Sequence, residues 1–267
     1  MRKLSRNPSS YPATWPIPHP QLELSAGEVH VWRVSLNPSD EWLLELFVQL
    51  RPEERKRAAS FRLERDCRHF IVCRGALRVL LGRYLGMAPD QIVLGAGPKG
   101  KPYLAVRDSR RPLHFNVSHS GGVALIALAL GREVGIDVEQ KRAIGDLEAL
   151  AEYALSQREH LAWRVLPESQ RPDAFFSCWS RKEAFIKAIG LGLALPLDSF
   201  DVSLAPGEPA ALLRVAGDPQ APSRWTMAEI PMEPEYAAAI VVEGHECHLQ
   251  ILGFDSWFVG QGRPAAA

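Results

Sequence analysis

The order of the elements is the feature of this sequence that most restricts its fold, because a strand, helices and further strands follow one another twice. In the first copy, alternating apolar and polar residues over 28–36 predict a half-buried strand. Helical spacing then runs from Ser39, a suitable N-cap, to residue 86, with one break. Two strand-like segments, 114–118 and 123–130, close this copy.

The second copy begins with the strand-like segment 134–140 and continues with helical patterns over 146–164 and 174–193. Three strand-like segments close it, at 195–204, 224–230 and 236–243. This repetition predicts an α/β (α+β) protein built from two similar halves.

The two predicted halves cover residues 28–133 and 134–250 and meet near Gly131–Val134. Residues 1–27 are rich in proline and serine and are expected to form an irregular N-terminal arm. Residues 251–267 are expected to form a C-terminal tail.

Charge and cysteine content exclude several classes of partner. The chain has 31 Lys and Arg residues and 31 Asp and Glu residues, so it lacks the global field that attracts nucleic acid or anionic membranes. Its four cysteines show neither metal-type spacing nor the density of a disulfide framework, which predicts reduced thiols in a cytoplasmic protein. No apolar run reaches the length of about 18 residues that a membrane span needs.

Two carboxylates lie inside the strand-like stretch VGIDVE, at Asp137 and Glu139. Side chains alternate along a strand, so both carboxylates project from one face and repel each other unless a cation compensates them. A solvent-facing pair on an edge strand would be the ordinary interpretation. The apolar neighbours Val134, Ile136 and Val138 indicate an interior strand instead.

A third carboxylate, Glu183, lies on a predicted helix, and Lys187 follows it by one turn. Three hard oxygen ligands without nearby histidine or cysteine clusters suit Mg²⁺, which completes its shell with water and substrate phosphates. Lys187 shares the helix face of Glu183 and would lie close to such phosphates. For the helix taken alone, a plain surface ion pair between the two residues is the alternative.

Two other segments are suited to binding phosphate. The glycine- and proline-rich loop 95–104 offers backbone that can approach a ligand, with Lys99 and Lys101 as point charges. Ser118, His119 and Ser120 are expected on a turn immediately after a strand, where hydroxyl and imidazole groups can donate to an anion. A hydrolase nucleophile at this turn is disfavoured, because the G-x-S-x-G elbow is missing.

Together these residues resemble the 4'-phosphopantetheinyl transferases of the surfactin-synthetase-activating type, over residues 28–245. The matching segments are LRPEERKRAASFRLERD (50–66), GKP (100–102), FNVSHSGG (115–122), VGIDVE (134–139), FSCWSRKEAFIKAIGLGL (176–193) and LPLDSF (195–200). The resemblance implies a pseudo-dimer of two α/β halves with the active site in the cleft between them. It also implies transfer of the phosphopantetheine arm of coenzyme A to a serine of an apo carrier protein, with adenosine 3',5'-bisphosphate as second product.

The resemblance also assigns roles to individual residues. Asp137, Glu139 and Glu183 would hold Mg²⁺ on the diphosphate of coenzyme A, and Lys187 would contact the phosphate that is transferred. The coenzyme A contacts would further include Lys101, Ser118, His119, Arg78 and one of Arg55 or Arg57.

Glu159 matches a glutamate that serves as general base in this family, although the surrounding sequence departs from the family's usual pattern. Ser156 and Glu159 also match a capping box, S-x-x-E, which is the alternative interpretation. Water on the metal is the other candidate for the base.

The partners implied are coenzyme A and an apo carrier protein or domain from a peptide-synthetase, polyketide or fatty-acid system, and a monomer is expected. Two other functions remain open. One is another Mg²⁺-dependent phosphotransferase, which the absence of Walker A and kinase motifs disfavours. The other is a coenzyme A-binding scaffold that has lost turnover.

Overall fold

The structure is a computed structural model that describes residues 15–16, 22–105, 112–245 and 247–260. Its strands are β1 (Glu28–Ser35), β2 (Leu94–Ala96), β3 (Pro102–Leu104), β4 (Leu113–Ser120), β5 (Val123–Leu130), β6 (Val134–Gln140), β7 (Phe200–Val202), β8 (Leu212–Val215), β9 (Trp225–Glu229), β10 (Tyr236–Glu243) and β11 (His248–Gly253). Its α-helices are α1 (Asp40–Val48), α2 (Pro52–Ala58), α3 (Glu64–Leu85), α4 (Leu147–Ala154), α5 (Gln157–Arg164), α6 (Arg171–Ile189), α7 (Ala221–Arg224) and α8 (Phe254–Gly260). None of the helices in these described ranges has the length and apolarity to cross a membrane.

The mixed α/β fold predicted from the sequence is confirmed, and its two sheets have matching topology. The first sheet has the order β11-β1-β5-β4 and the second the order β6-β10-β9. In each, the first strand of the copy pairs antiparallel with the last, which pairs with the strand before it. Each copy also carries one long helix, α3 or α6, and a small hairpin, β2–β3 or β7–β8.

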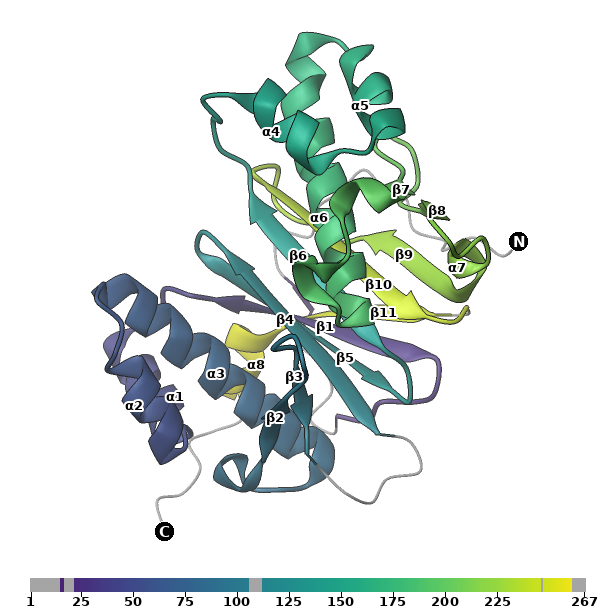
Figure 1. Ribbon diagram of the computed structural model, residues 1–267. Coiled ribbons are helices and arrows are strands. Elements are labelled where there is room, and N and C mark those ends of the chain that lie inside the picture. Colours follow the sequence, from purple (N-terminus) through teal and green to yellow (C-terminus); the bar gives the residue numbers. More distant parts are fainter. Residues whose placement is uncertain (1–14, 17–21, 106–111, 246, 261–267) are drawn as a thin grey trace.

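Three apolar clusters divide the molecule into layers. The first lies between α3 and the first sheet, and the third lies between α6 and the second sheet. The middle cluster joins the facing sides of the two sheets, with Val31 and Leu125 from the first and Ile136 and Ile240 from the second. Figure 1 shows α3 beside the first sheet and α6 in front of the second sheet, with α4 and α5 beside the upper end of α6.

Alternation along β6 sends its apolar side chains into the middle cluster and its acidic ones toward α6. Val134, Ile136 and Val138 are buried between the sheets. Gly135 lies on the opposite face, where an added Cβ would come within 2.1 Å of the Ala184 carbonyl oxygen of α6. Only glycine permits this close approach, and it sets α6 directly against the strand that carries Asp137.

The C-terminal tail predicted from residue 251 differs from the structure. Residues 251–253 belong to β11, which pairs in parallel with β1 at the edge of the first sheet. Helix α8 follows, and its Phe254 and Trp257 are buried in the first cluster. These aromatic residues are three apart and therefore share a helix face, so the segment packs instead of fraying.

The structure differs from the sequence-based prediction at two further element boundaries. The helical pattern of 146–164 is divided into α4 and α5, because Ser156 caps a new helix after Leu155. His119 lies within β4 rather than in a turn, and Gly121, with φ of 58°, makes the turn to β5. The predicted cap at Ser39 is confirmed by its side chain, which accepts from the amide of Trp42. Most of the predicted N-terminal arm lies outside the described residues.

Candidate functional site

The two sheets are joined by side chains of β4 that bond to the backbone of β6. The amides of Ile136, Val138 and Gln140 donate to Asn116 Oδ1, Ser118 Oγ and Ser120 Oγ, over 2.9, 3.4 and 3.0 Å respectively. Alternate residues of β4 thus replace a backbone ladder, and their two-residue spacing matches that of the amides they bind.

Asp137, Lys187 and Ser118 meet in one triangle of contacts. The Lys187 ammonium lies 2.6 Å from Asp137 Oδ1 and 2.8 Å from Ser118 Oγ, and the serine hydroxyl donates to the same aspartate oxygen over 2.8 Å. Asp137 is 2% exposed, whereas Lys187 is only half-buried. A charged ammonium, a hydroxyl and a buried carboxylate from β4, β6 and α6 therefore converge.

Glu139 is held by two donors that the sequence interpretation did not assign. Ser120 Oγ donates to Glu139 Oε2 over 3.1 Å, and Trp179 Nε1 donates to Oε1 over 3.1 Å. Burial raises the pKa of Glu139, and so does the neighbouring Asp137. The matched spacing of Ser118 and Ser120 against Asp137 and Glu139 was the signal in the sequence that could have identified Ser120.

Glu183 completes the predicted acidic set from α6. Its pKa is raised by burial, and then by Asp137 and Glu139, while Lys187 opposes the shift. Two carboxylates, Glu139 and Glu183, whose ionisation is disfavoured by burial and by neighbouring negative charge are an environment that a cation relieves.

A second observation also indicates that the donor set fits a Mg²⁺ ion. Asp137 Oδ2 is buried and has no hydrogen-bond partner, so one carboxylate oxygen of the cluster remains free for a ligand. All three residues offer the hard oxygen donors that Mg²⁺ prefers. The three carboxylates do not all lie within 4.8 Å of one another, and Lys187 occupies the other oxygen of Asp137.

His119 extends the site toward the first half. The pKa of its imidazole is lowered by partial burial and then by the nearby Lys187 ammonium. His69 of α3 is close enough for the two imidazoles to repel each other when charged, which also lowers the pKa of His69 after the effect of burial. Two imidazoles on facing elements therefore border the site.

Lys101 is engaged elsewhere. Its ammonium donates to Glu133 Oε2 over 2.7 Å, to the Ala188 carbonyl over 2.8 Å and to the Val134 carbonyl over 3.3 Å. An ammonium has three N–H donors, so these contacts use all of them. A nucleotide phosphate could bind Lys101 only by displacing one of these partners.

Arg78 is buried and engaged by other protein groups, so its contact with the nucleotide stays a prediction. It is 1% exposed, forms a two-point ion pair with Glu54 and donates to the carbonyls of Pro89 and Ile92. The helical pattern around Arg78 did not predict its ion pair with Glu54, because Glu54 lies on a different helix.

The two arginines left as alternatives are placed differently. Arg55 donates to the carbonyls of Val48 and Leu50 and so closes the C-terminal end of α1. Arg57 is exposed and lies over the ring of Phe70 on α3, 5.3 Å from its centroid. Arg57 is therefore the one whose guanidinium is more available to a ligand.

Glu159 has a structural role that confirms the capping alternative, while its role as general base stays a prediction. Its side chain and that of Ser156 form the reciprocal capping box of α5. Glu159 Oε1 also accepts from the Val202 amide over 2.7 Å, and Oε2 lies 2.7 Å from the ammonium of Lys182. Glu159 is only 2% exposed and both of its oxygens already accept from protein donors, which favours the capping role over proton transfer.

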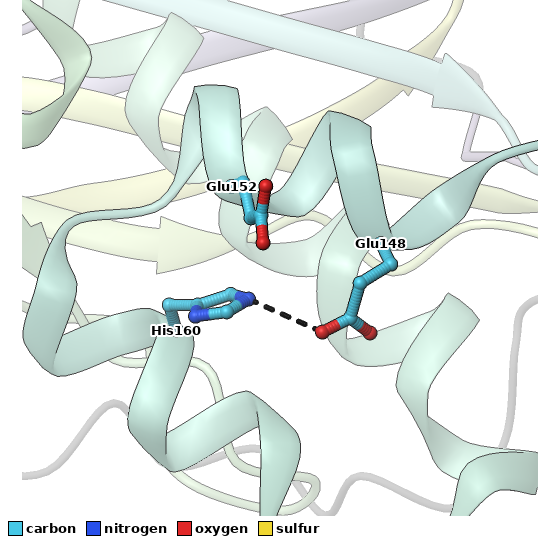
Figure 2. A group of neighbouring side chains, drawn as sticks. All are labelled: Glu148, Glu152 and His160. Atoms are coloured by element: carbon cyan, nitrogen blue, oxygen red, sulfur yellow. Dashed lines mark ion pairs between the residues drawn. The ribbon is translucent and has the colours of Figure 1, made fainter.

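A second cluster, formed by Glu148 and Glu152 of α4 and His160 of α5, was not predicted (Figure 2). Among the described residues, this is the group of three whose candidate ligand atoms all lie within 4.8 Å of one another. His160 lies 3.6 Å from Glu148, which also pairs with Arg164 over 3.5 Å. Because Glu152 is exposed and Glu148 already pairs with the Arg164 guanidinium, the cluster is a solvated polar network.

The strand and helix contact around Asp137 thus combines three carboxylates, a lysine, two hydroxyls and an imidazole. These are the groups of an enzyme that binds and transfers a phosphorylated substrate.

Comparison with known proteins identifies the family to which this enzyme belongs. Residues 133–241 match the 4'-phosphopantetheinyl transferase superfamily, and residues 34–130 match the N-terminal part of 4'-phosphopantetheinyl transferases. The chain is 38% identical to 4'-phosphopantetheinyl transferase HetI from Nostoc sp., over 86% of this chain and 94% of the relative. It therefore belongs to the 4'-phosphopantetheinyl transferase family and transfers the phosphopantetheine arm of coenzyme A to carrier proteins.

Other relatives are more distant. The chain is 33% identical to a 4'-phosphopantetheinyl transferase from Bacillus subtilis, over 57% of this chain and 65% of that protein. It is 29% identical to the human L-aminoadipate-semialdehyde dehydrogenase-phosphopantetheinyl transferase, over 76% of this chain and 69% of that one. A solved structure of holo-[acyl-carrier-protein] synthase from Thermotoga maritima aligns with a TM-score of 0.35 at 25% identity, covering 42% of this chain and 62% of that one.

Proposed function

We propose that this transferase is of the surfactin-synthetase-activating type and that Asp137, Glu139 and Glu183 hold Mg²⁺ on the diphosphate of coenzyme A. The observation that carries the proposal is the free, buried Asp137 Oδ2 beside two carboxylates whose pKa values are raised. When bound, the cation neutralises negative charge on the diphosphate.

Lys187 binds the phosphate that is transferred. Its ammonium is half-buried and already lies between Asp137 and Ser118, so little rearrangement would bring it to a phosphate oxygen. An ammonium fixed in this way stabilises charge that develops during transfer without having to reorganise.

Ser118 and His119 bind the nucleotide side of coenzyme A, with Arg57 as the available arginine of the first half. The hydroxyl of Ser118 accepts a hydrogen bond from Lys187, and His119, the next residue of β4, is exposed. These are donors to an anion, and their placement on β4 keeps them next to the carboxylates of β6.

The reaction forms one bond and breaks another. The serine oxygen of the carrier bonds to the phosphorus that bears the pantetheine arm. The bond from that phosphorus to the bridging oxygen of the diphosphate breaks, and adenosine 3',5'-bisphosphate leaves with that oxygen. The serine proton passes to a base, and the burial of Glu159 favours another group at the site for this role.

We further propose that the carrier belongs to a peptide-synthetase, polyketide or fatty-acid system and that the enzyme acts as a cytoplasmic monomer. Residues 28–133 and 134–250 are proposed as its two halves, except that residues 248–250 belong to β11 of the first sheet, and the reaction is proposed at the contact between the halves. The matching strand order of the two sheets supports this division.

The test is incubation of the purified protein with coenzyme A and a panel of apo carriers, followed by mass spectrometry of each carrier. A mass gain of one phosphopantetheine is expected with Mg²⁺, and a chelator should abolish it until Mg²⁺ is restored. Full activity in excess chelator would overturn the metal proposal, and no gain on any carrier would overturn the choice of carrier class.

A further inference from the structure

A network around Lys101 links three parts of the chain that are distant in sequence. Lys101 precedes β3 in the first half, Glu133 lies between β5 and β6, and Ala188 is in the last turn of α6. The Lys101 ammonium bonds to the Glu133 carboxylate and to the Ala188 carbonyl, over 2.7 and 2.8 Å.

The end of α6 is suited to such a cation. The last four carbonyls of a helix have no partner within the helix, and the C-terminal end carries partial negative charge. The Ala188 carbonyl belongs to this group, and Lys101 satisfies it from the other half. Packing supports the same placement, because the Lys101 side chain lies against Gly190, the C-cap of α6.

Glu133 fixes Lys101 in this position. One of its oxygens binds the ammonium, and His114 Nδ1 lies 3.1 Å from the other. The hydrogen bond from His114 comes first among the causes that lower the pKa of Glu133 to about 2, and Lys101 adds to it. The carboxylate is therefore ionised, and the pair with Lys101 persists, throughout the neutral range.

We propose that Glu133 is a positioning residue for the transfer reaction. By holding Lys101 on the Ala188 carbonyl, it fixes the last turn of α6 against the first half. Lys187 immediately precedes Ala188, so this turn also sets where the Lys187 ammonium stands relative to Ser118. The inference rests on the proposed role of Lys187 at the transferred phosphate.

The competing role for Lys101 is direct contact with the 3'-phosphate of coenzyme A. The two roles differ in what the loss of Lys101 does. A lost phosphate contact removes the preference for coenzyme A over dephospho-coenzyme A. A lost positioning contact lowers the rate of transfer for both substrates and leaves that preference unchanged.

The experiment compares Glu133→Gln, Lys101→Met and the double variant with the wild-type enzyme. Turnover and KM for coenzyme A and dephospho-coenzyme A are measured at a saturating apo carrier, together with urea unfolding curves. The matched control is Glu243→Gln, the same change at the exposed last residue of β10, whose carboxylate accepts from the Glu133 amide.

Each single variant is expected to lose about tenfold in kcat with KM changed less than about twofold, because a misplaced catalytic group chiefly affects the chemical step. The kcat of the double variant should fall no further than that of either single variant, because all three variants remove the same contact between Glu133 and Lys101. Glu243→Gln should retain wild-type kcat.

Wild-type kcat in Glu133→Gln, multiplied losses in the double variant, or lost 3'-phosphate preference in Lys101→Met would each overturn the inference. Should Glu133→Gln fail to fold, Lys101→Met carries the same expectation, because its side chain lies outside the three apolar clusters. If the wild-type protein modified no carrier, the proposed function would fail, whereas full activity in both variants contradicts the positioning role alone.

Discussion

At the scale of single residues, Asp137 combines two requirements that normally conflict. Its carboxylate is buried, yet one of its oxygens has no hydrogen-bond partner. An ionised group in this state is costly unless a cation joins it. The cost is tolerated because Lys187 and Ser118 satisfy the other oxygen and keep the side chain oriented.

Asp137→Asn should reduce turnover by at least about a hundredfold while leaving the melting temperature near that of the wild type. Asparagine can still accept from Lys187 and Ser118, but it brings no negative charge to the site. Steady-state turnover and a melting curve measure the two effects. Asp173→Asn, which alters an exposed carboxylate paired with Lys141, is the control. Near-wild-type turnover in Asp137→Asn would refute the role of this carboxylate.

Glu159→Gln should destabilise the protein by about 3–5 kcal/mol, because it leaves the ammonium of Lys182 buried without its counter-charge. Glutamine suits an ordinary capping box, but here donors approach both oxygens, so its NH₂ group must face another donor. Urea unfolding measures the loss, with Glu152→Gln on exposed α4 as control. Unchanged stability with lost turnover would restore Glu159 as the base.

At the scale of elements, the contact between β4 and β6 determines the site. Three polar residues of β4 bind alternate amides of β6, and two of them also bind Asp137 and Glu139. The strands therefore cannot slide past each other without separating Ser118 from Asp137.

Asn116→Ala should cost about 1–3 kcal/mol, because the buried amide of Ile136 loses its acceptor and water cannot replace it. Ser120→Ala is the matched comparison, since the Gln140 side of its contact is exposed and should cost less. The urea midpoints of the two variants show which substitution costs more stability. An equal or smaller loss in Asn116→Ala would mean that the side-chain bonds of β4 do not hold the strands in register.

The sequence predicted elements whose signal is local and missed those whose signal is a distant partner. The apolar alternation around Asp137 predicted β6, and the lysine one turn after Glu183 predicted the shared face of α6. The ion pairs of Arg78 and Glu159 were not predicted, because Glu54 and Lys182, which bind them, lie on other helices. Burial by such partners leaves no periodic trace in the sequence.

At the scale of the whole molecule, the chain returns at its end to the sheet where it began. After the second sheet is complete, β11 pairs in parallel with β1, and α8 packs beneath the first sheet. Trp257 of α8 packs against Trp32 of β1, with ring centroids 5.1 Å apart. The first half therefore depends on residues that follow the second.

A chain ending at Cys247 should lose cooperative unfolding of its first half, because β1 becomes an edge strand and the first cluster loses Phe254 and Trp257. Trp257→Ala is the milder version and should cost about 3–5 kcal/mol, whereas Trp257→Phe should cost less. Thermal unfolding followed by circular dichroism distinguishes them. A shortened chain that melts like the full one would show that β11 and α8 are dispensable.

The return of β11 also sets an order for biosynthesis. On the ribosome, domains generally fold from the N-terminus as they emerge. Here β6, β10 and β9 are all translated before the strand that flanks β1. The second sheet can form while the first still lacks its outer strand, β11. The half that is translated first therefore completes its folding last.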